Sequence, residues 1–269
     1  MKLTRPISAI GSVGIEMLEF IGGIGYLLLD TAAATGRGLF SKRGRRTGWR
    51  NLSAQMVRVG VRSVPIVSLV LFCIGAILVF QISPVLKNYG ALDRVADIVS
   101  LAIFRELGPL VSAIVLTGFA GASIAAEVGT MVVSEEIEAL EAHAINPVRF
   151  LVVPRVLATT VMMICIAIIG DLAGVLGGFT VAVTFLGIGP RQYWTHTFEI
   201  LQLQDFFTGL VKAGVFGSLI SGLACHLGLG VTGGAQGVGN ATTRTVVYTI
   251  VALIAVDLLF TSVFYYLGW

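Results

Sequence analysis

Apolar residues dominate five stretches of the chain, and each has about 20 residues or more, the length that an α-helix needs to cross the hydrocarbon core of a bilayer. The stretches run from about Val64 to Ile82, from Ile98 to Val128, from Phe150 to Ile188, from Phe206 to Leu229 and from Val246 to Leu267. The third is long enough for a tilted or broken span. The pattern predicts an all-α integral membrane protein with five transmembrane helices.

A sixth apolar stretch, residues 7–29, is interrupted by polar or small residues at every third or fourth position. This stripe consists of Arg5, Ser8, Ser12, Glu16, Glu19, Gly23 and Asp30. Such spacing places the residues on one face of a helix, and two carboxylates in mid-segment are costly in hydrocarbon. We therefore expect an amphipathic helix in the membrane interface. A cleaved signal peptide is the alternative, because Lys2 and Arg5 precede the stretch and alanines 32–34 follow it, but Glu16 and Glu19 argue against it.

An acidic segment, SEEIEALEAHAINP at residues 134–147, separates the second apolar stretch from the third. Ser134 is a suitable N-cap residue. Glu135 and Glu136 would place negative charge at the positive end of the helix dipole, and Asn146-Pro147 is expected to end the helix. We predict a helix of about three turns at residues 134–145, which is too short and too charged to span a bilayer.

The acidic helix needs a partner other than lipid. Its apolar positions Ile137, Leu140 and Ala144 share one side, with Glu138 and Glu141 nearby. Acidic side chains interact poorly with the anionic inner leaflet, so we expect the helix to face a protein. A cytosolic protein that presents a groove with basic groups would suit it. A solvated surface loop is the alternative.

Composition and charge set the orientation of the spans. Hydrophobic residues make up 56% of the 269 residues and charged residues only 12%, with a mean hydropathy of +0.92, whereas soluble domains are about a quarter charged. Eight lysines and arginines lie between Arg37 and Arg62, so this segment and the N-terminus should be cytoplasmic. Five spans then place the acidic segment inside and the C-terminus outside.

These features divide the chain into two expected parts. Residues 1–50 form the interfacial helix and a basic cytoplasmic segment, and residues 51–269 form the five-span domain. The net charge of +3 is too small to indicate a nucleic-acid partner. "SKRGRR" is therefore interpreted as a positive-inside signal rather than a nucleic-acid patch.

Arg105 and Glu106 stand together near the predicted outer end of the second span, just before Gly108-Pro109. Ionisable residues within a membrane are functional candidates. A proline tends to break a helix and free carbonyls, so a break here would suit a polar cavity in which Arg105 holds a phosphate. The alternative is that both side chains reach the interface and tie helices together. The sequence leaves the two readings open.

Other ionisable groups lie in or near the spans, namely Glu127, Asp171, Lys212, His226 and Asp257. Asp171 and Asp257 lie deep and should have partners, and structural hydrogen bonding is favoured over a proton relay. We expect no catalytic residues and no metal site. "GLGVTG" matches a dinucleotide fingerprint in letters only, because an apolar span precedes it rather than a strand, so no cofactor is expected on this chain.

Two motifs resemble a known family. RELGPLVSAIVLTGFAGASIAAEVGTMVVSEEIEALEAHAINPVRFLVVPR, at residues 105–155, resembles the core signature of the MlaE (YrbE) permease family, and GNATTRTVV, at residues 239–247, resembles its C-terminal motif. The similarity extends over nearly the whole chain. It implies the membrane subunit of an ABC transporter in the bacterial inner membrane, which moves phospholipids between that membrane and the outer envelope.

The resemblance also implies partners. These are a second copy of the chain in a homodimer, a cytosolic ABC ATPase that binds ATP and Mg, a hexameric ring of MCE-domain subunits on the outer side, and often a small STAS-domain protein. A membrane enzyme that acts on lipids without ATP-coupled transport, or a membrane scaffold, is the alternative function.

Carried over by position, the resemblance assigns two sets of residues. Residues 134–145 match the coupling helix that docks into the ATPase, through Ser134, Glu135, Glu136, Ile137, Glu138, Leu140 and Glu141. Arg105 and Glu106 match a charged pair near a lipid cavity between two permeases, which Leu78, Ile82, Val85 and Tyr89 would also line. The chain departs from the family at Phe119, often arginine, at Glu136, often glutamine, and at Asn146, often aspartate.

Overall fold

The computed structural model describes residues 15, 18, 22–33 and 52–268. Within these residues the secondary structure is entirely helical. Five helical segments are long and apolar enough to cross a membrane: Leu52–Asn88, Leu92–Val133, Val148–Leu186, Leu203–Leu229 and Gly234–Tyr266. The predicted all-α membrane fold with five spans is confirmed, and the segments extend beyond most of the predicted bounds.

The individual helices subdivide these segments, except for α7 (Glu136–Ala142) and α9 (Pro190–Ile200), which lie between them. The helices within the segments are α3 (Val64–Asn88), α4 (Val95–Ala102), α5 (Gly108–Leu116), α6 (Ala122–Val133), α8 (Val153–Leu186), α10 (Leu203–Leu229) and α11 (Gly234–Tyr266). Short π-helical turns at Val57–Val61, Ile103–Leu107, Thr117–Gly121 and Val148–Val152 lie within or before the spans. The second span is thus one continuous run of α4, α5 and α6 joined by two π-helical turns.

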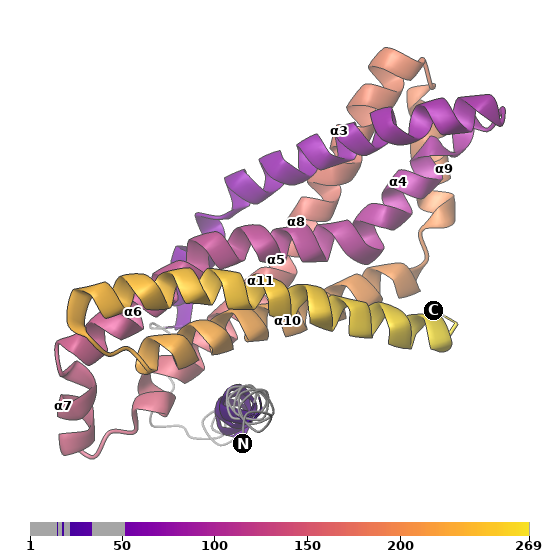
Figure 1. The fold of residues 1–269 in the computed structure, drawn as a ribbon. Helices are drawn as coiled ribbons and strands as arrows, with labels where there is room; N and C mark the ends of the chain where they lie inside the picture. Colours follow the sequence, from indigo (N-terminus) through magenta and orange to yellow (C-terminus); the bar gives the residue numbers. More distant parts are fainter. Residues whose placement is uncertain (1–14, 16–17, 19–21, 34–51, 269) are drawn as a thin grey trace, which may run out of the picture.

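The spans lie side by side as an elongated bundle with two distinct ends (Figure 1). The short helix α7 caps one end, whereas α9 and the C-terminus lie at the other. In the centre, α8 packs against α3 and α10. A Cβ at Gly75 would overlap the carbonyl oxygen of Gly174, and one at Gly177 would overlap that of Phe72. Small residues thus let the backbones of α3 and α8 approach closely.

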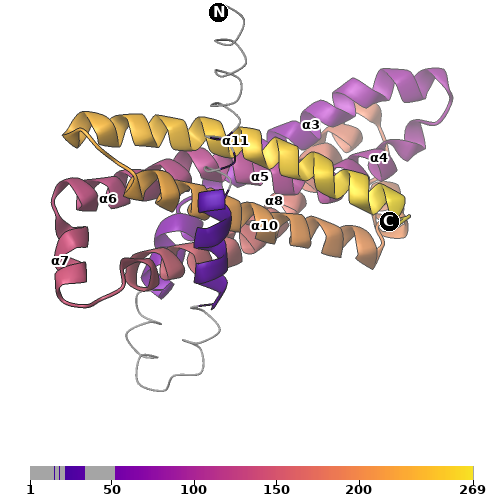
Figure 2. The same ribbon diagram turned by 60° about the horizontal axis from the view of Figure 1, so that its bottom comes forward.

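The helical residues 22–33 cross the direction of the spans (Figures 1 and 2). Leu27 and Leu28 pack against the core, and Gly23 lies against the ring of His226 in α10. Tyr26 and Leu29 are exposed on the other side. This crosswise orientation is the one expected of an interfacial helix, although most of the predicted stripe, including Glu16 and Glu19, lies outside the described residues.

The acidic helix is shorter than predicted. It spans only Glu136–Ala142, and the expected N-cap role of Ser134 is wrong. The Ser134 hydroxyl instead donates to the carbonyl of Thr130 at the end of α6, 2.9 Å away. The turn into α7 is made by Glu135, whose φ of 60° is left-handed.

The end of α7 also differs from the prediction. Ala144 has a φ of 58°, and the N–H of Ile145 donates to the carbonyl of Leu140. This is the hydrogen-bond pattern of a Schellman motif. Asn146 does not end α7, because its side chain accepts a hydrogen bond from the N–H of Arg149 and so caps the next helical segment.

The helix α9 was not predicted, since residues 190–205 are polar enough to suggest a loop. Pro190 occupies its first turn, where the missing N–H costs nothing. Tyr193 is fully buried. Beside it, the rings of Trp194 and Phe198 stack on each other with 5.8 Å between their centroids. Burial raises the pKa of the Tyr193 phenol, as expected for a side chain that anchors α9 in the core.

Candidate functional site

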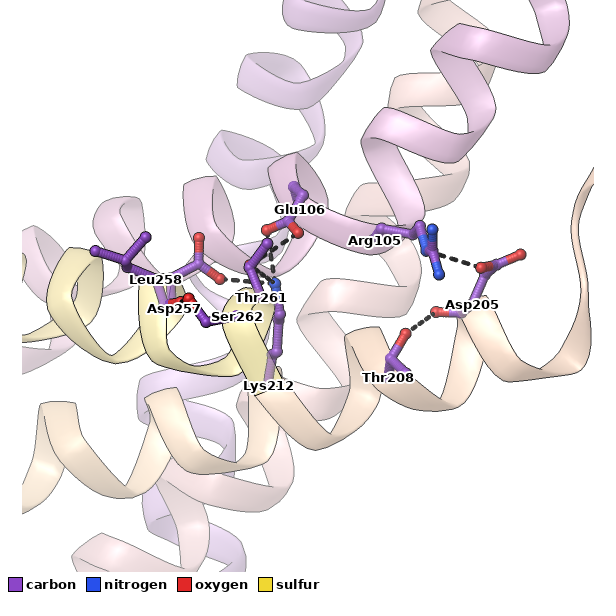
Figure 3. A network of polar contacts seen from close by, with 9 residues as sticks. All are labelled: Arg105, Glu106, Asp205, Thr208, Lys212, Asp257, Leu258, Thr261 and Ser262. Atoms are coloured by element: carbon purple, nitrogen blue, oxygen red, sulfur yellow. Dashed lines mark hydrogen bonds and ion pairs between the residues drawn. The ribbon is translucent and has the colours of Figure 1, made fainter. Parts of the chain in front are cut away.

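Arg105 and Glu106 lie on the π-helical turn Ile103–Leu107 of the second span. The N–H of Gly108 donates to the carbonyl of the first residue of this turn, and the wider turn accommodates Pro109, which has no N–H to donate. The helix therefore continues into α5, and the predicted break at Gly108-Pro109 is wrong. Figure 3 shows that Arg105 points toward Asp205, whereas Glu106 points toward Lys212 and Thr261.

Arg105 is anchored on α10. Its Nε lies 2.9 Å from Oδ1 of Asp205. The other carboxylate oxygen of Asp205 accepts the N–H of Gln202 at 3.0 Å, which forms a capping box at the start of α10. Asp205 is nearly buried, whereas about a third of the Arg105 side chain remains exposed. The contact is made at Nε, and a guanidinium has further N–H donors that a phosphate or carboxylate can accept.

Glu106 is held by a fully buried lysine of the same helix, α10. Nζ of Lys212 in α10 lies 2.6 Å from Oε2 of Glu106 and 2.9 Å from Oγ1 of Thr261 in α11, both as hydrogen bonds. Oδ1 of Asp257 lies 2.9 Å from the same nitrogen as an ion pair, outside hydrogen-bonding geometry. The Thr261 hydroxyl donates to Glu106 at 3.0 Å. Three helical segments are therefore tied together at one ammonium group (Figure 3).

A cavity of about 510 Å³ opens beside these groups. Its walls come from α4, the end of α9, α10 and α11. They include Asp97, Leu101, Arg105, Glu106, Thr208, Lys212, Thr261 and Tyr265. This volume lies within the range of small-molecule sites. Most of the wall is apolar, and its charged groups are Asp97, Arg105, Glu106 and Lys212, which suits an amphiphile whose polar part is anionic or zwitterionic.

A second polar group closes the cavity toward α9. Asp97 lies 3.0 Å from Arg94 and 3.3 Å from Nδ1 of His196. The neighbouring hydroxyls of Ser100 and Thr197 are hydrogen-bonded at 3.2 Å. Because Asp97 also lines the cavity, these contacts fix α9 against α4 at its edge.

The structure bears on both readings left open for Arg105 and Glu106. The two side chains tie helices together and also line the 510 Å³ cavity, whose wall is mostly apolar. The four α3 positions are placed elsewhere. Leu78 and Ile82 pack against the core between α3, α4 and α8, whereas Val85 and Tyr89 are exposed. None of the four lines the 510 Å³ cavity, so their contact with lipid stays a prediction.

The sequence did not reveal the partners of the charged pair. Lys212 and Asp257 were singled out as ionisable groups within spans, but not as neighbours of Glu106. Asp205 and Thr261 were not singled out at all. One signal was available in the sequence. Opposite charges occur in three apolar segments, toward the same expected side of the membrane, and charges in lipid need partners of opposite sign.

The two deep aspartates differ from each other. Asp257 has Lys212 as its partner, as expected. Oδ1 of Asp171 is buried in α8 against Gly108 and has no hydrogen-bond partner among the described residues, contrary to the expectation.

Glu127 is bound by two arginines at the α7 end of the bundle. Arg58 lies 2.9 Å away and the buried Arg155 lies 3.3 Å away. This cluster joins the segment that leads into α3 with α6 and α8.

At this same end, α7 presents an acidic surface. Glu136, Glu138 and Glu141 are exposed, and Ile137 and Leu140 are only partly buried. Its closest neighbour in the described chain is α6. The exposed helix α7 and the helix α9 therefore lie at opposite ends of the bundle (Figure 1), and Ile200 at the end of α9 lines the cavity.

Comparison with known proteins gives a consistent result. The family model described as Permease MlaE matches residues 52–263. A probable ABC transporter permease protein of Rickettsia felis is 40% identical over 255 residues, which cover 94% of this chain and 96% of the relative. The intermembrane phospholipid transport system permease protein MlaE of Haemophilus influenzae is 30% identical over 263 residues, which cover 97% and 98%.

Proposed function

The chain belongs to the MlaE permease family of ABC transporter membrane subunits, and from this premise we propose that it carries phospholipids between the bacterial inner membrane and the outer envelope. The observation that carries the proposal is the cavity beside Arg105. An apolar wall suited to acyl chains adjoins a guanidinium whose N–H groups can donate to a phosphate. The Haemophilus relative is named for phospholipid transport.

The energy for transport enters through a partner. The exposed acidic helix α7 docks into a cytosolic ABC ATPase, which binds the ATP and Mg, so this chain needs no cofactor. Ser134, Glu135, Glu136, Ile137, Glu138, Leu140 and Glu141 form or border the docking surface. Support comes from the exposure of three of its carboxylates and from its position at the end of the bundle opposite α9. ATP-driven movement of α7 would reach the cavity as a shift of the packed spans.

The assembly has two permeases and further subunits. Two copies form a homodimer in which Leu78, Ile82, Val85 and Tyr89 line the shared lipid cavity. A hexameric MCE-domain ring lies on the periplasmic side, near α9 and the C-terminus, and a STAS-domain protein joins the ATPase. The N-terminus is cytoplasmic. Arg58 supports this orientation, because this described member of the basic segment lies at the α7 end.

Lipid transfer between vesicles tests the proposal. Permease and ATPase are reconstituted together, and transfer of a fluorescent phospholipid to acceptor vesicles with the MCE-domain protein is followed with and without ATP. We expect ATP-dependent transfer that Arg105→Ala reduces at least tenfold. A lipid-modifying enzyme would instead change the lipid chemically, and a scaffold would give no transfer.

A further inference from the structure

The charges around the cavity do not form a purely basic site. The lining residues and their direct ion-pair partners comprise three cations and four carboxylates. They are Arg94, Arg105 and Lys212 together with Asp97, Glu106, Asp205 and Asp257. With His196 neutral, the formal charge of the cluster is one negative. A site for an anionic headgroup alone would be expected to carry a surplus of positive charge.

Lys212 adds little to anion binding, because its ammonium is already occupied. Two of its three N–H donors go to Glu106 and Thr261, and Oδ1 of Asp257 lies 2.9 Å away as an ion pair. The side chain is only 1% exposed. Arg105 is therefore the group on this wall that can still hold a phosphate.

Of the two carboxylates that line the cavity, Asp97 is already paired with Arg94 and His196, and the more exposed one is Glu106. Its side chain is 37% exposed, whereas Asp205 and Asp257, the partners behind the wall, are 8% and 14% exposed. Each oxygen of Glu106 accepts one hydrogen bond, from Lys212 or from Thr261. A carboxylate offers about four acceptor sites, so Glu106 retains capacity for a further donor from the cavity.

We propose that the cavity selects phospholipids whose headgroup carries an amine, with the phosphate on Arg105 and the ammonium on Glu106. The inference rests on the proposed transport function and deepens it by naming the lipid class. Such a zwitterionic headgroup leaves the charge of the cluster unchanged, whereas an anionic headgroup adds a second uncompensated negative charge in a region of low dielectric. Phe264 and Tyr265 also line the cavity, and their rings favour a nearby cation.

Binding of short-chain lipids to the purified full-length permease in detergent tests this selection. The probes are dioctanoyl phosphatidylethanolamine and dioctanoyl phosphatidylglycerol, which share the phosphate and differ in the amine. We expect the ethanolamine lipid to bind at least about tenfold more tightly, a difference of about 1.4 kcal/mol. Glu106→Gln should abolish this preference by weakening the ethanolamine lipid.

Asp257→Asn is the matched control, because it removes the same charge and also releases a partner of Lys212, but at a residue that does not line the cavity. It should keep most of the preference. Equal binding of both lipids to the wild type, with both weakened by Arg105→Gln, would overturn the amine selection and leave the proposed function standing. If both lipids bind and Arg105→Gln leaves their binding unchanged, the phosphate site on Arg105 and the amine selection are both overturned. Thermal unfolding of each variant verifies that it is folded.

Discussion

Lys212 and Glu106 are separated by 106 positions in sequence, yet Nζ of one lies 2.6 Å from Oε2 of the other. The lysine is fully buried between α10 and α11, and the glutamate reaches it from the second span. Such a contact replaces the hydration that either charge would lose in a bilayer. Together with the contacts of Lys212 to Thr261 and Asp257, it holds the second, fourth and fifth spans together beside the cavity.

Removal of the Lys212 charge alone should destabilise the fold more than removal of the charges of Lys212, Glu106 and Asp257 together. Lys212→Met leaves Glu106 and Asp257 without their cation, and losing one partner of a buried pair costs about 3 kcal/mol or more. The triple variant with Glu106→Gln and Asp257→Asn should recover much of that loss. Thermal unfolding in detergent measures both. A triple variant less stable than Lys212→Met would show that the carboxylates have other stabilising partners.

Close packing of α3 and α8 gives a second prediction. Gly75→Ala should prevent normal packing, because the new methyl group would overlap the carbonyl oxygen of Gly174. Gly118→Ala is the control, since no atom lies within 4 Å of its added Cβ, and alanine favours a helix by about 1 kcal/mol over glycine. Size-exclusion chromatography after mild heating compares the two. Equal behaviour would mean that α3 and α8 are able to separate at little cost.

The acidic surface of α7 gives a third prediction, about the ATPase. Glu138→Lys with Glu141→Lys reverses two exposed charges without touching the core, so the permease should remain folded while the ATPase co-purifies at least tenfold less. Glu199→Lys, on α9 at the opposite end, is the control and should leave ATPase recovery unchanged. Unchanged recovery with the α7 variant would remove α7 from the docking surface.

Sequence patterns predicted the spans well because the bilayer imposes a length and a polarity on each. They predicted α7 less well because local signals are ambiguous. Asn146-Pro147 can end one helix or begin the next, and only the packed chain shows that Asn146 caps the following segment. The left-handed conformations of Glu135 and Ala144 were not predictable, because the usual sequence signal for them is a glycine and neither position has one.

The candidate site was predicted only in part, for a different reason. Arg105 and Glu106 stand out as charges in an apolar segment. Their partners depend on which spans become neighbours and on the rotation of each helix, and neither is encoded in one segment. The π-helical turn at Ile103–Leu107 adds to this difficulty, because it shifts the register that a regular helix would give the two side chains.

The two deep aspartates provide the last prediction, since the same substitution should affect stability differently at the two positions. Asp257→Asn removes the charge of a carboxylate whose Oδ1 lies 2.9 Å from Nζ of Lys212. It should therefore lower the unfolding temperature. Asp171→Asn replaces a buried carboxyl whose Oδ1 has no hydrogen-bond partner among the described residues. An amide of the same shape fits the site, and no ion pair or hydrogen bond among the described residues is lost, so stability should change little. Thermal unfolding of both variants in the same detergent and buffer makes the comparison. A clear loss of stability in Asp171→Asn would mean that the carboxyl at Gly108 is required in its own right, and that the unpaired aspartate has a role beyond packing.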